Sequence, residues 1–311
     1  MLGVSVRTTP EDVRPAELVE LGFQVPKPRH PVFHAVWWSS NLLLAAALLG
    51  VLFAGLREFG LRYYLDGFSD AIAPGVLPAE SKVQAILDWM RIEPSRAVAA
   101  NPSALSARDP HITLNYQQLL RVCGTATNAF LNLAREDDLV VRRLLLLAPD
   151  GSTKHVVAEV LLDGRWIVVD PTYHLIMKDA QGRPLTRQDL RNPALFEQAV
   201  GPVADYPQNY NYEHATHVRL ERVPLFAVLH LRKALDAIYP AWDEAADWNL
   251  LLERESFFYL TLACVAAIFL LGMRLLLGWY ADSRLRVPRF HLRDRVLRAS
   301  VAFFSPPEIK E

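Results

Sequence analysis

Residues 155–172 read HVVAEVLLDGRWIVVDPT. Two apolar runs rich in β-branched residues lie on either side of Asp163-Gly164, a dipeptide that favours a two-residue hairpin turn. The stretch therefore predicts two antiparallel strands. Around such a turn, facing residues have numbers that sum to about 327. His155 and Asp170 come close to that sum, so we expect them to be near neighbours across the hairpin.

The pattern upstream of the hairpin changes from strand-like to helix-like. Residues 139–148 (LVVRRLLLLA) predict a further strand, and Asp150-Gly151 predicts the turn that follows it. Before that strand, apolar residues recur at helical spacing in 82–90 and in about 116–134. The second of these helices is expected to bury Leu119, Val122, Ala126, Ala129, Phe130 and Leu133. Helices followed by an antiparallel sheet indicate an α+β fold rather than an alternating doubly wound one.

Three chemically suggestive residues fall on these elements. Cys123 lies toward the start of the second helix, where the helix dipole favours a thiolate. His155 and Asp170 supply an imidazole and a carboxylate able to orient it. Each alone has an ordinary structural explanation: a small buried thiol, a core histidine and an aspartate at a turn. Together, in this order, they predict a Cys-His-Asp triad.

The same segments resemble the transglutaminase-like superfamily, most specifically in the stretch from His155 to Asp170. The resemblance covers about 80–175, roughly a third of the chain. It implies a papain-like core in which Cys123 is the nucleophile, His155 the general base and acid, and Asp170 the residue that orients the imidazole. It also implies structural roles for Glu159 and Trp166. One departure is Val157, where the family often has an aromatic residue two positions after the histidine.

Other polar residues give weaker signals. The backbone N–H of Cys123 and the side chain of Gln117 or Gln118 are candidates for an oxyanion hole, although a solvated amide is the more ordinary role for either glutamine. The spacing of His214 and His217 could suit a metal, but no third ligand is evident. We therefore expect these two histidines to lie in surface loops, and we expect no metal or cofactor.

Two apolar blocks predict transmembrane helices at 35–57 and 256–280. Residues 35–56 carry no charge and would form about 33 Å of helix, enough to cross a bilayer core of about 30 Å. Aromatic residues flank both blocks, as at membrane interfaces. Arg274, near the end of the second block, can extend toward the headgroups.

Charge on the flanks predicts the orientation. The second block is followed by a basic stretch, which marks the cytoplasmic side: Arg284, Arg286, Arg289, Arg293, Arg295 and Arg298. Segments 1–34 and 281–311 are then cytoplasmic, and 58–255 is a single extracytoplasmic domain. The expected location is the inner, cytoplasmic membrane of a bacterial cell.

Composition excludes other classes. The formal net charge of −1 gives no electrostatic case for nucleic acid. Two cysteines, one of them in an apolar block, are too few for a disulfide scaffold or a zinc site of several thiolates. Two spans with one terminal arginine offer no polar pathway for a transporter.

The sequence thus predicts a membrane-anchored cysteine hydrolase, a peptidase, amidase or acyltransferase that works through a thioester. Its substrate would be a protein, a peptide or another component outside the cytoplasmic membrane. The lipid bilayer and other membrane proteins are its further candidate partners. The alternative is an inactive module of the same fold that binds a partner in an envelope or polysaccharide-assembly complex.

Overall fold

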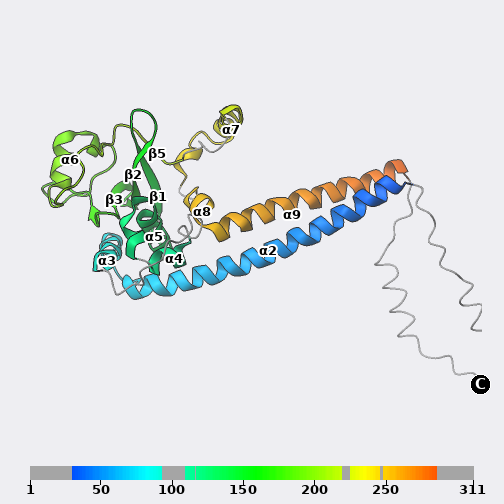
Figure 1. The fold of residues 1–311 in the computed structure, drawn as a ribbon, viewed down its shortest axis with the longest axis horizontal. Coiled ribbons are helices and arrows are strands. Elements are labelled where there is room, and N and C mark those ends of the chain that lie inside the picture. Colours follow the sequence, from blue (N-terminus) through cyan, green and yellow to red (C-terminus); the bar gives the residue numbers. More distant parts are fainter. Residues whose placement is uncertain (1–29, 93–108, 116, 219–224, 246–247, 286–311) are drawn as a thin grey trace, which may run out of the picture. The chain divides into compact units, whose positions relative to one another are not determined.

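The structure of the chain, a computed structural model, describes residues 30–92, 109–115, 117–218, 225–245 and 248–285. The chain divides into two compact units: residues 46–269, and residues 1–45 together with 270–311. The first unit is an α+β domain, as predicted, in which helices pack on a five-stranded antiparallel sheet (Figure 1).

The sheet has the order β4-β3-β2-β1-β5, with every neighbouring pair antiparallel. Its strands are β1 (Val141–Leu147), β2 (Thr153–Leu162), β3 (Arg165–Asp170), β4 (Leu175–Ile176) and β5 (Ala215–Thr216). The hairpin register is the one predicted, since Ala158 pairs with Val169. Asp163 and Gly164 have φ of 49° and 76°. Positive φ at both central residues is what a tight type I′ hairpin turn requires.

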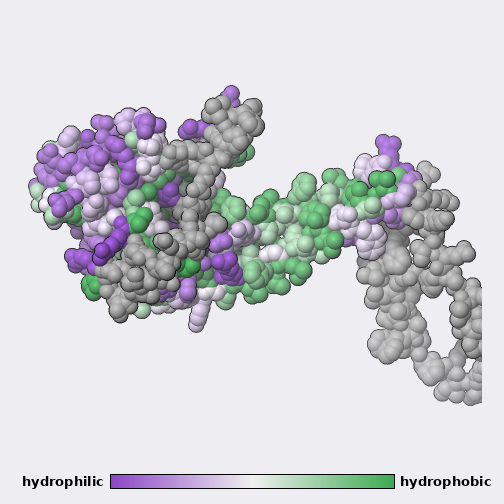
Figure 2. Space-filling model, in the orientation of Figure 1, coloured by the Kyte–Doolittle hydropathy of each residue, from purple (hydrophilic) through white to green (hydrophobic). Residues whose placement is uncertain are grey.

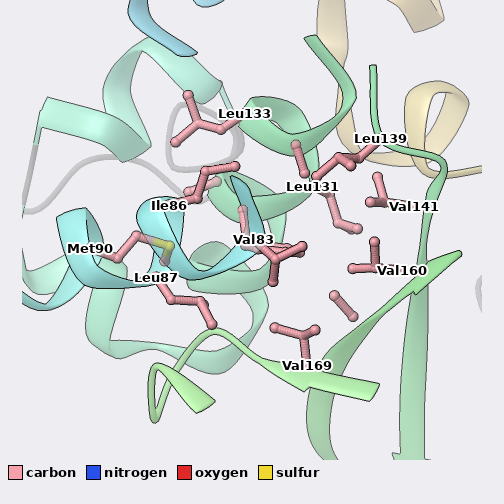
Figure 3. Close-up of a cluster of buried hydrophobic side chains, with 14 of the residues drawn as sticks. Val83, Ile86, Leu87, Met90, Leu131, Leu133, Leu139, Val141, Val160 and Val169 are labelled. Carbon is pink, nitrogen blue, oxygen red and sulfur yellow. The ribbon is translucent and has the colours of Figure 1, made fainter. Parts of the chain in front are cut away.

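One face of the sheet packs on the helices that precede it: α3 (Ala79–Ile92), α4 (Pro110–Asn115), the 3₁₀ turn η3 (Gln117–Arg121) and α5 (Cys123–Glu136). Figure 3 shows side chains of α3 meeting those of α5 and the strands in this core. The buried apolar residues of α3 are those at the predicted helical spacing, namely Val83, Ile86, Leu87 and Met90. This core fixes α5 against the strand that carries His155.

The helix predicted over 116–134 begins later, at Cys123 itself. Val122 is extended, with φ −97° and ψ 124°, and is 54% exposed, so its predicted burial is wrong. The hydroxyl of Thr125 donates to the carbonyls of Leu119 and Val122. Such hydrogen bonds compete with the helical ladder and favour a break at this point. The break places the thiol in the first turn of α5.

The other face of the sheet is covered by the chain that follows β4. Leu144, Val157 and Val168 point to this side and pack against Phe196 and Tyr212, among others. Helix α6 (Pro193–Val200) lies here and is capped by Asn192, whose side chain accepts a hydrogen bond from the Ala194 N–H at 3.1 Å. The remaining short elements are η4 (Asp189–Arg191), α7 (Leu225–Ile238), η5 (Trp242–Glu244), α8 (Trp248–Glu253) and a π-helical turn (Ala281–Leu285).

Two helices, α2 (Pro31–Ile72) and α9 (Glu255–Tyr280), are long and apolar enough to cross a membrane. Their surfaces are predominantly hydrophobic, whereas that of the sheet domain is largely hydrophilic (Figure 2). Within the larger unit the two helices approach each other closely at Gly50, where an added Cβ would lie 3.6 Å from the Cβ of Ala263. In the smaller unit the Arg274 guanidinium lies 4.2 Å from the centre of the Trp37 ring.

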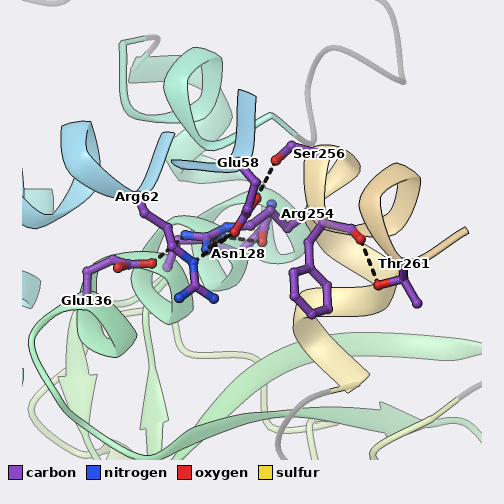
Figure 4. Close-up of polar contacts among 9 residues, drawn as sticks. Glu58, Arg62, Asn128, Glu136, Arg254, Ser256 and Thr261 are labelled. Carbon is purple, nitrogen blue, oxygen red and sulfur yellow. Dashed lines mark hydrogen bonds and ion pairs between the residues drawn. The ribbon is translucent and has the colours of Figure 1, made fainter. Parts of the chain in front are cut away.

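Helix α2 extends beyond the predicted end of its span and carries Glu58 into a buried polar cluster (Figure 4). Arg254, between α8 and α9, is only 1% exposed. It donates to Glu58 at 2.9 Å, to Asn132 at 3.0 Å and to Glu136 at 2.7 Å. Ser256 donates to the other Glu58 oxygen at 2.6 Å. The cluster ties the adjoining parts of α2 and α9 to the C-terminal half of α5.

Candidate active site

The structure brings His155 and Asp170 into direct contact. The Nε2 atom of His155 and the Oδ2 atom of Asp170 are 2.7 Å apart, and Asp170 is fully buried. The other carboxylate oxygen, Oδ1, accepts the backbone N–H groups of Thr172 at 3.0 Å and Tyr173 at 3.4 Å. A carboxylate held by donors can only accept, so the proton between the two side chains belongs to Nε2. The hairpin therefore supplies an imidazole with one defined tautomer.

This arrangement leaves Nδ1 of His155 as the nitrogen available for proton transfer. Nδ1 is buried and has no hydrogen-bond partner of normal geometry among the described residues. Burial lowers the pKa of His155, but its interactions with Asp170 and Cys123 outweigh that effect and raise the pKa to about 9. Interaction with His155 is the largest influence on the Cys123 thiol and lowers its pKa, against the opposing effect of burial. Both shifts favour a thiolate–imidazolium pair at neutral pH.

The local fold places Cys123 beside this imidazole. The thiol is partly exposed, and backbone hydrogen bonds from Val156 and Gly124 lower its pKa further. The hydroxyl of Thr127, one turn into α5, donates to the carbonyl of Val156 at 2.9 Å. This buried bond joins the first turns of α5 to the residue next to His155. The helix dipole at the N-terminus of α5 adds to the stabilisation of negative charge on sulfur.

Tyrosines that the sequence analysis did not single out complete the surroundings. The Tyr206 hydroxyl donates to Oδ2 of Asp170 at 2.8 Å. The Tyr210 ring stacks on the His155 ring, with centroids 4.3 Å apart and planes 5° from parallel. Tyr173 meets the same ring edge-on at 6.0 Å. Tyr206, Tyr210 and Tyr212 lie close together in the sequence, but neither their spacing nor the position of Tyr173 indicated which residues they contact.

A second buried charge cluster lies at Glu159. Its Oε2 atom accepts from Arg142 at 2.7 Å and from His217 at 2.8 Å, and the Arg142 guanidinium lies 3.9 Å from the centre of the Trp166 ring. Burial opposes ionisation of Glu159, yet His217 and Arg142 lower its pKa. The expectation that His217 lies in a surface loop is wrong, because it is only 7% exposed. Glu159 is buried, whereas Trp166 is half-buried and lies against the guanidinium that pairs with Glu159.

Gln117, Gln118 and His214 are the remaining candidates from the sequence. The backbone of Gln117 belongs to η3, and its side chain lies outside what the structure describes, as does that of Gln118. His214 is exposed, as expected. Within the described ranges, no group of three His, Cys, Asp or Glu side chains is placed to hold a metal ion.

Comparisons with known proteins give no relative: no protein-family model, no curated protein and no solved structure matches this chain. Fold and site together describe an α+β domain with a thiol at a helix N-terminus facing a carboxylate-oriented imidazole, a combination suited to nucleophilic attack on an acyl carbon.

Proposed function

We propose that this chain is a membrane-anchored cysteine hydrolase of the transglutaminase-like type, with a papain-like core and Cys123, His155 and Asp170 as its triad. The observation that carries the proposal is the 2.7 Å contact between His155 Nε2 and Asp170 Oδ2, which leaves Nδ1 without a hydrogen-bond partner among the described residues. Interaction with the same imidazole lowers the pKa of the Cys123 thiol. A histidine that merely filled the core would need neither the carboxylate nor the nearby thiol.

In the first half of the reaction the Cys123 thiolate attacks the carbonyl carbon of an amide, and a carbon–sulfur bond forms. Nδ1 of the His155 imidazolium gives its proton to the leaving amine as the carbon–nitrogen bond breaks, which leaves a thioester. In the second half a water molecule attacks the thioester carbonyl, Nδ1 takes the proton of that water, and the thiolate leaves. An amine in place of water would give acyl transfer by the same steps.

Charge that develops on the carbonyl oxygen needs donors. The backbone N–H of Cys123 lies at the free N-terminus of α5, where helical N–H groups have no partner within the helix. It is our first candidate for the oxyanion hole, and the Gln117 side chain remains a second one. Asp170 keeps the imidazole in the tautomer and orientation that both halves of the reaction use.

The proposal places the domain outside the cytoplasmic membrane, with both termini inside. The support is the arginine-rich sequence after α9, which marks the cytoplasmic side. Single cysteines at exposed positions test it in a background without Cys123 and Cys264. Asp150→Cys should react with a membrane-impermeant maleimide in intact spheroplasts, and Ser283→Cys should react only after permeabilisation. The reverse pattern contradicts the orientation.

The activity itself is tested with a substrate-independent acyl donor. The full-length chain in detergent is mixed with a p-nitrophenyl ester, and intact mass and nitrophenol release are followed. We expect a transient acyl adduct on Cys123 and continuing turnover, with no adduct in Cys123→Ala and a slow one in His155→Ala. Absence of an adduct, or one that forms equally without His155, refutes the hydrolase and favours a domain that binds a partner.

A further inference from the structure

We propose that Tyr206 and Tyr210 are positioning residues of this site: Tyr206 holds the Asp170 carboxylate through its hydroxyl, and Tyr210 holds the His155 ring through its face. The inference rests on the proposed function and extends it to residues 206–212 (YPQNYNY), which we call the tyrosine segment. This segment comes from the part of the chain after α6, and no chemistry is assigned to it by the sequence patterns.

The Tyr206 hydroxyl occupies the last acceptor position that the dyad leaves open on Asp170. Oδ2 receives Nε2–H of His155 and the Tyr206 hydroxyl at 2.7 Å and 2.8 Å, while Oδ1 receives backbone N–H groups. Tyr206 is 4% exposed, and burial raises its pKa, so the hydroxyl stays protonated and acts as a donor. Tyr206 therefore fixes the position of the Oδ2 atom that accepts from the imidazole.

Tyr210 acts on the other partner of the dyad. Its ring lies flat on the imidazole, and His155 is only 1% exposed under it. An aromatic face attracts a cation placed over it, more strongly where water is excluded. The stack therefore favours the imidazolium and restrains rotation of the ring away from the thiol. The part that matters is the ring face and not the hydroxyl.

The tyrosine segment is held in place over the dyad from several sides. Lys154 donates to the Asn209 carbonyl at 3.4 Å and Arg191 to the Tyr212 carbonyl at 3.4 Å. Just beyond the segment, the backbone N–H of Leu147 in β1 donates to the His214 carbonyl at 2.8 Å. These contacts hold a stretch that has little regular structure. A loop that presents two rings at defined positions needs such contacts.

Among the residues that the structure describes, the ionisable groups that face the dyad are a thiol and tyrosines: Cys123 from α5, Tyr173 after β3, and Tyr206, Tyr210 and Tyr212 from the tyrosine segment. Burial raises the pKa of each of these tyrosines, so they remain protonated below about pH 9. A change in the pH profile of the thiol between about pH 5 and 9 then reports on the Cys-His-Asp system itself.

The test measures the rate of Cys123 alkylation by iodoacetamide across that pH range. It uses the full-length chain in lipid nanodiscs with Cys264→Ala, which leaves one thiol. Tyr206→Phe keeps the ring and loses the hydroxyl, Tyr210→Phe keeps the stack, and Tyr210→Leu loses it. Tyr239→Phe, at a tyrosine 56% exposed and outside the site, is the control for loss of a hydroxyl.

We expect Tyr206→Phe to move the midpoint of the profile up by about one pH unit, which slows alkylation about tenfold below both midpoints and leaves it unchanged near pH 9. Tyr210→Phe should match the parent, and Tyr210→Leu should slow alkylation about threefold or more near neutral pH. Loss of the hydroxyl is thus expected to matter at Tyr206, and loss of the aromatic ring at Tyr210.

A Tyr206→Phe profile that superimposes on the parent overturns the role of Tyr206, even if thermal unfolding shows lower stability. Equal rates for Tyr210→Phe and Tyr210→Leu overturn that of Tyr210. Either result leaves the proposed function standing, provided that the parent thiol is activated. An ordinary thiol titration in the parent overturns the proposed function and this inference with it.

Discussion

Replacing Arg254 by methionine removes the centre of the buried cluster that ties α2 and α9 to α5. Methionine keeps much of the length and volume of the aliphatic part of arginine but donates nothing. Three charge-assisted hydrogen bonds are lost, to Glu58, Asn132 and Glu136. Two carboxylates then remain in a site where the side chains are only 5% and 13% exposed.

The expected loss of folding stability depends on the hydrogen bonds that the two carboxylates keep. Removing one partner of a buried ion pair typically costs about 3–5 kcal/mol, because the other charge is left uncompensated. Glu58 keeps its hydrogen bonds from Arg62 at 3.0 Å and Ser256 at 2.6 Å, which holds the cost within that range although two carboxylates are affected. At about 2–4 °C per kcal/mol, the melting temperature should fall by roughly 6–20 °C.

The assay is thermal unfolding of the full-length chain in one detergent, followed by circular dichroism. Arg62→Met is the matched control, because Arg62 also donates to Glu58 but its side chain is 49% exposed. A surface pair of this kind is worth at most about 1 kcal/mol. In the double variant Glu58→Gln/Arg254→Met the loss should be partly recovered. If Arg254→Met melts within 1–2 °C of Arg62→Met, roughly the effect of a weak surface pair, the reasoning about this cluster is wrong.

Three further substitutions test which residues affect the reactivity of the thiol and which affect the stability of the fold. Asp170→Asn removes the carboxylate that raises the pKa of His155, so that pKa should fall and iodoacetamide alkylation of the thiol near pH 6 should slow by about tenfold or more. Glu159→Gln leaves the Arg142 guanidinium without its buried counter-charge and should cost about 3 kcal/mol in denaturant unfolding, with the alkylation profile unchanged; a shifted profile contradicts the separation of the two clusters. Thr127→Val removes the buried bond between α5 and β2 and should lower stability by about 1–3 kcal/mol and slow alkylation, whereas an unaltered rate means that the bond does not position the thiol.

The parts of this fold that could be predicted are those set by local rules. Asp163-Gly164 fixes the turn, the turn fixes the register, and the register places His155 near Asp170. Each step involves neighbours in sequence. The apolar period that predicted the buried face of α3 is local in the same sense. The contact of the dyad thus followed from eighteen consecutive residues, 155–172.

The parts that could not be predicted depend on contacts between distant segments. Tyr206 lies 36 residues from the carboxylate to which it donates, and the stretch between them contains no long regular element. His217 is 58 residues from Glu159, so its burial followed from no local pattern. The start of α5 at Cys123 was missed because the apolar period runs on through Val122, although the backbone of Val122 is extended and only its carbonyl takes part in the helical ladder.

The central claim is that Cys123 is an activated nucleophile, and its alkylation rate as a function of pH tests that claim most directly. The full-length Cys264→Ala chain is compared with the same chain carrying His155→Ala. A lowered pKa means that the thiolate persists as the pH falls, so the parent should react rapidly well below the ordinary thiol pKa of about 8.5. Without His155 the largest lowering influence is gone and the opposing effect of burial remains, so the midpoint should move up toward the ordinary value. If both chains instead titrate alike near about pH 8.5, Cys123 is an ordinary thiol and the account of this site is contradicted.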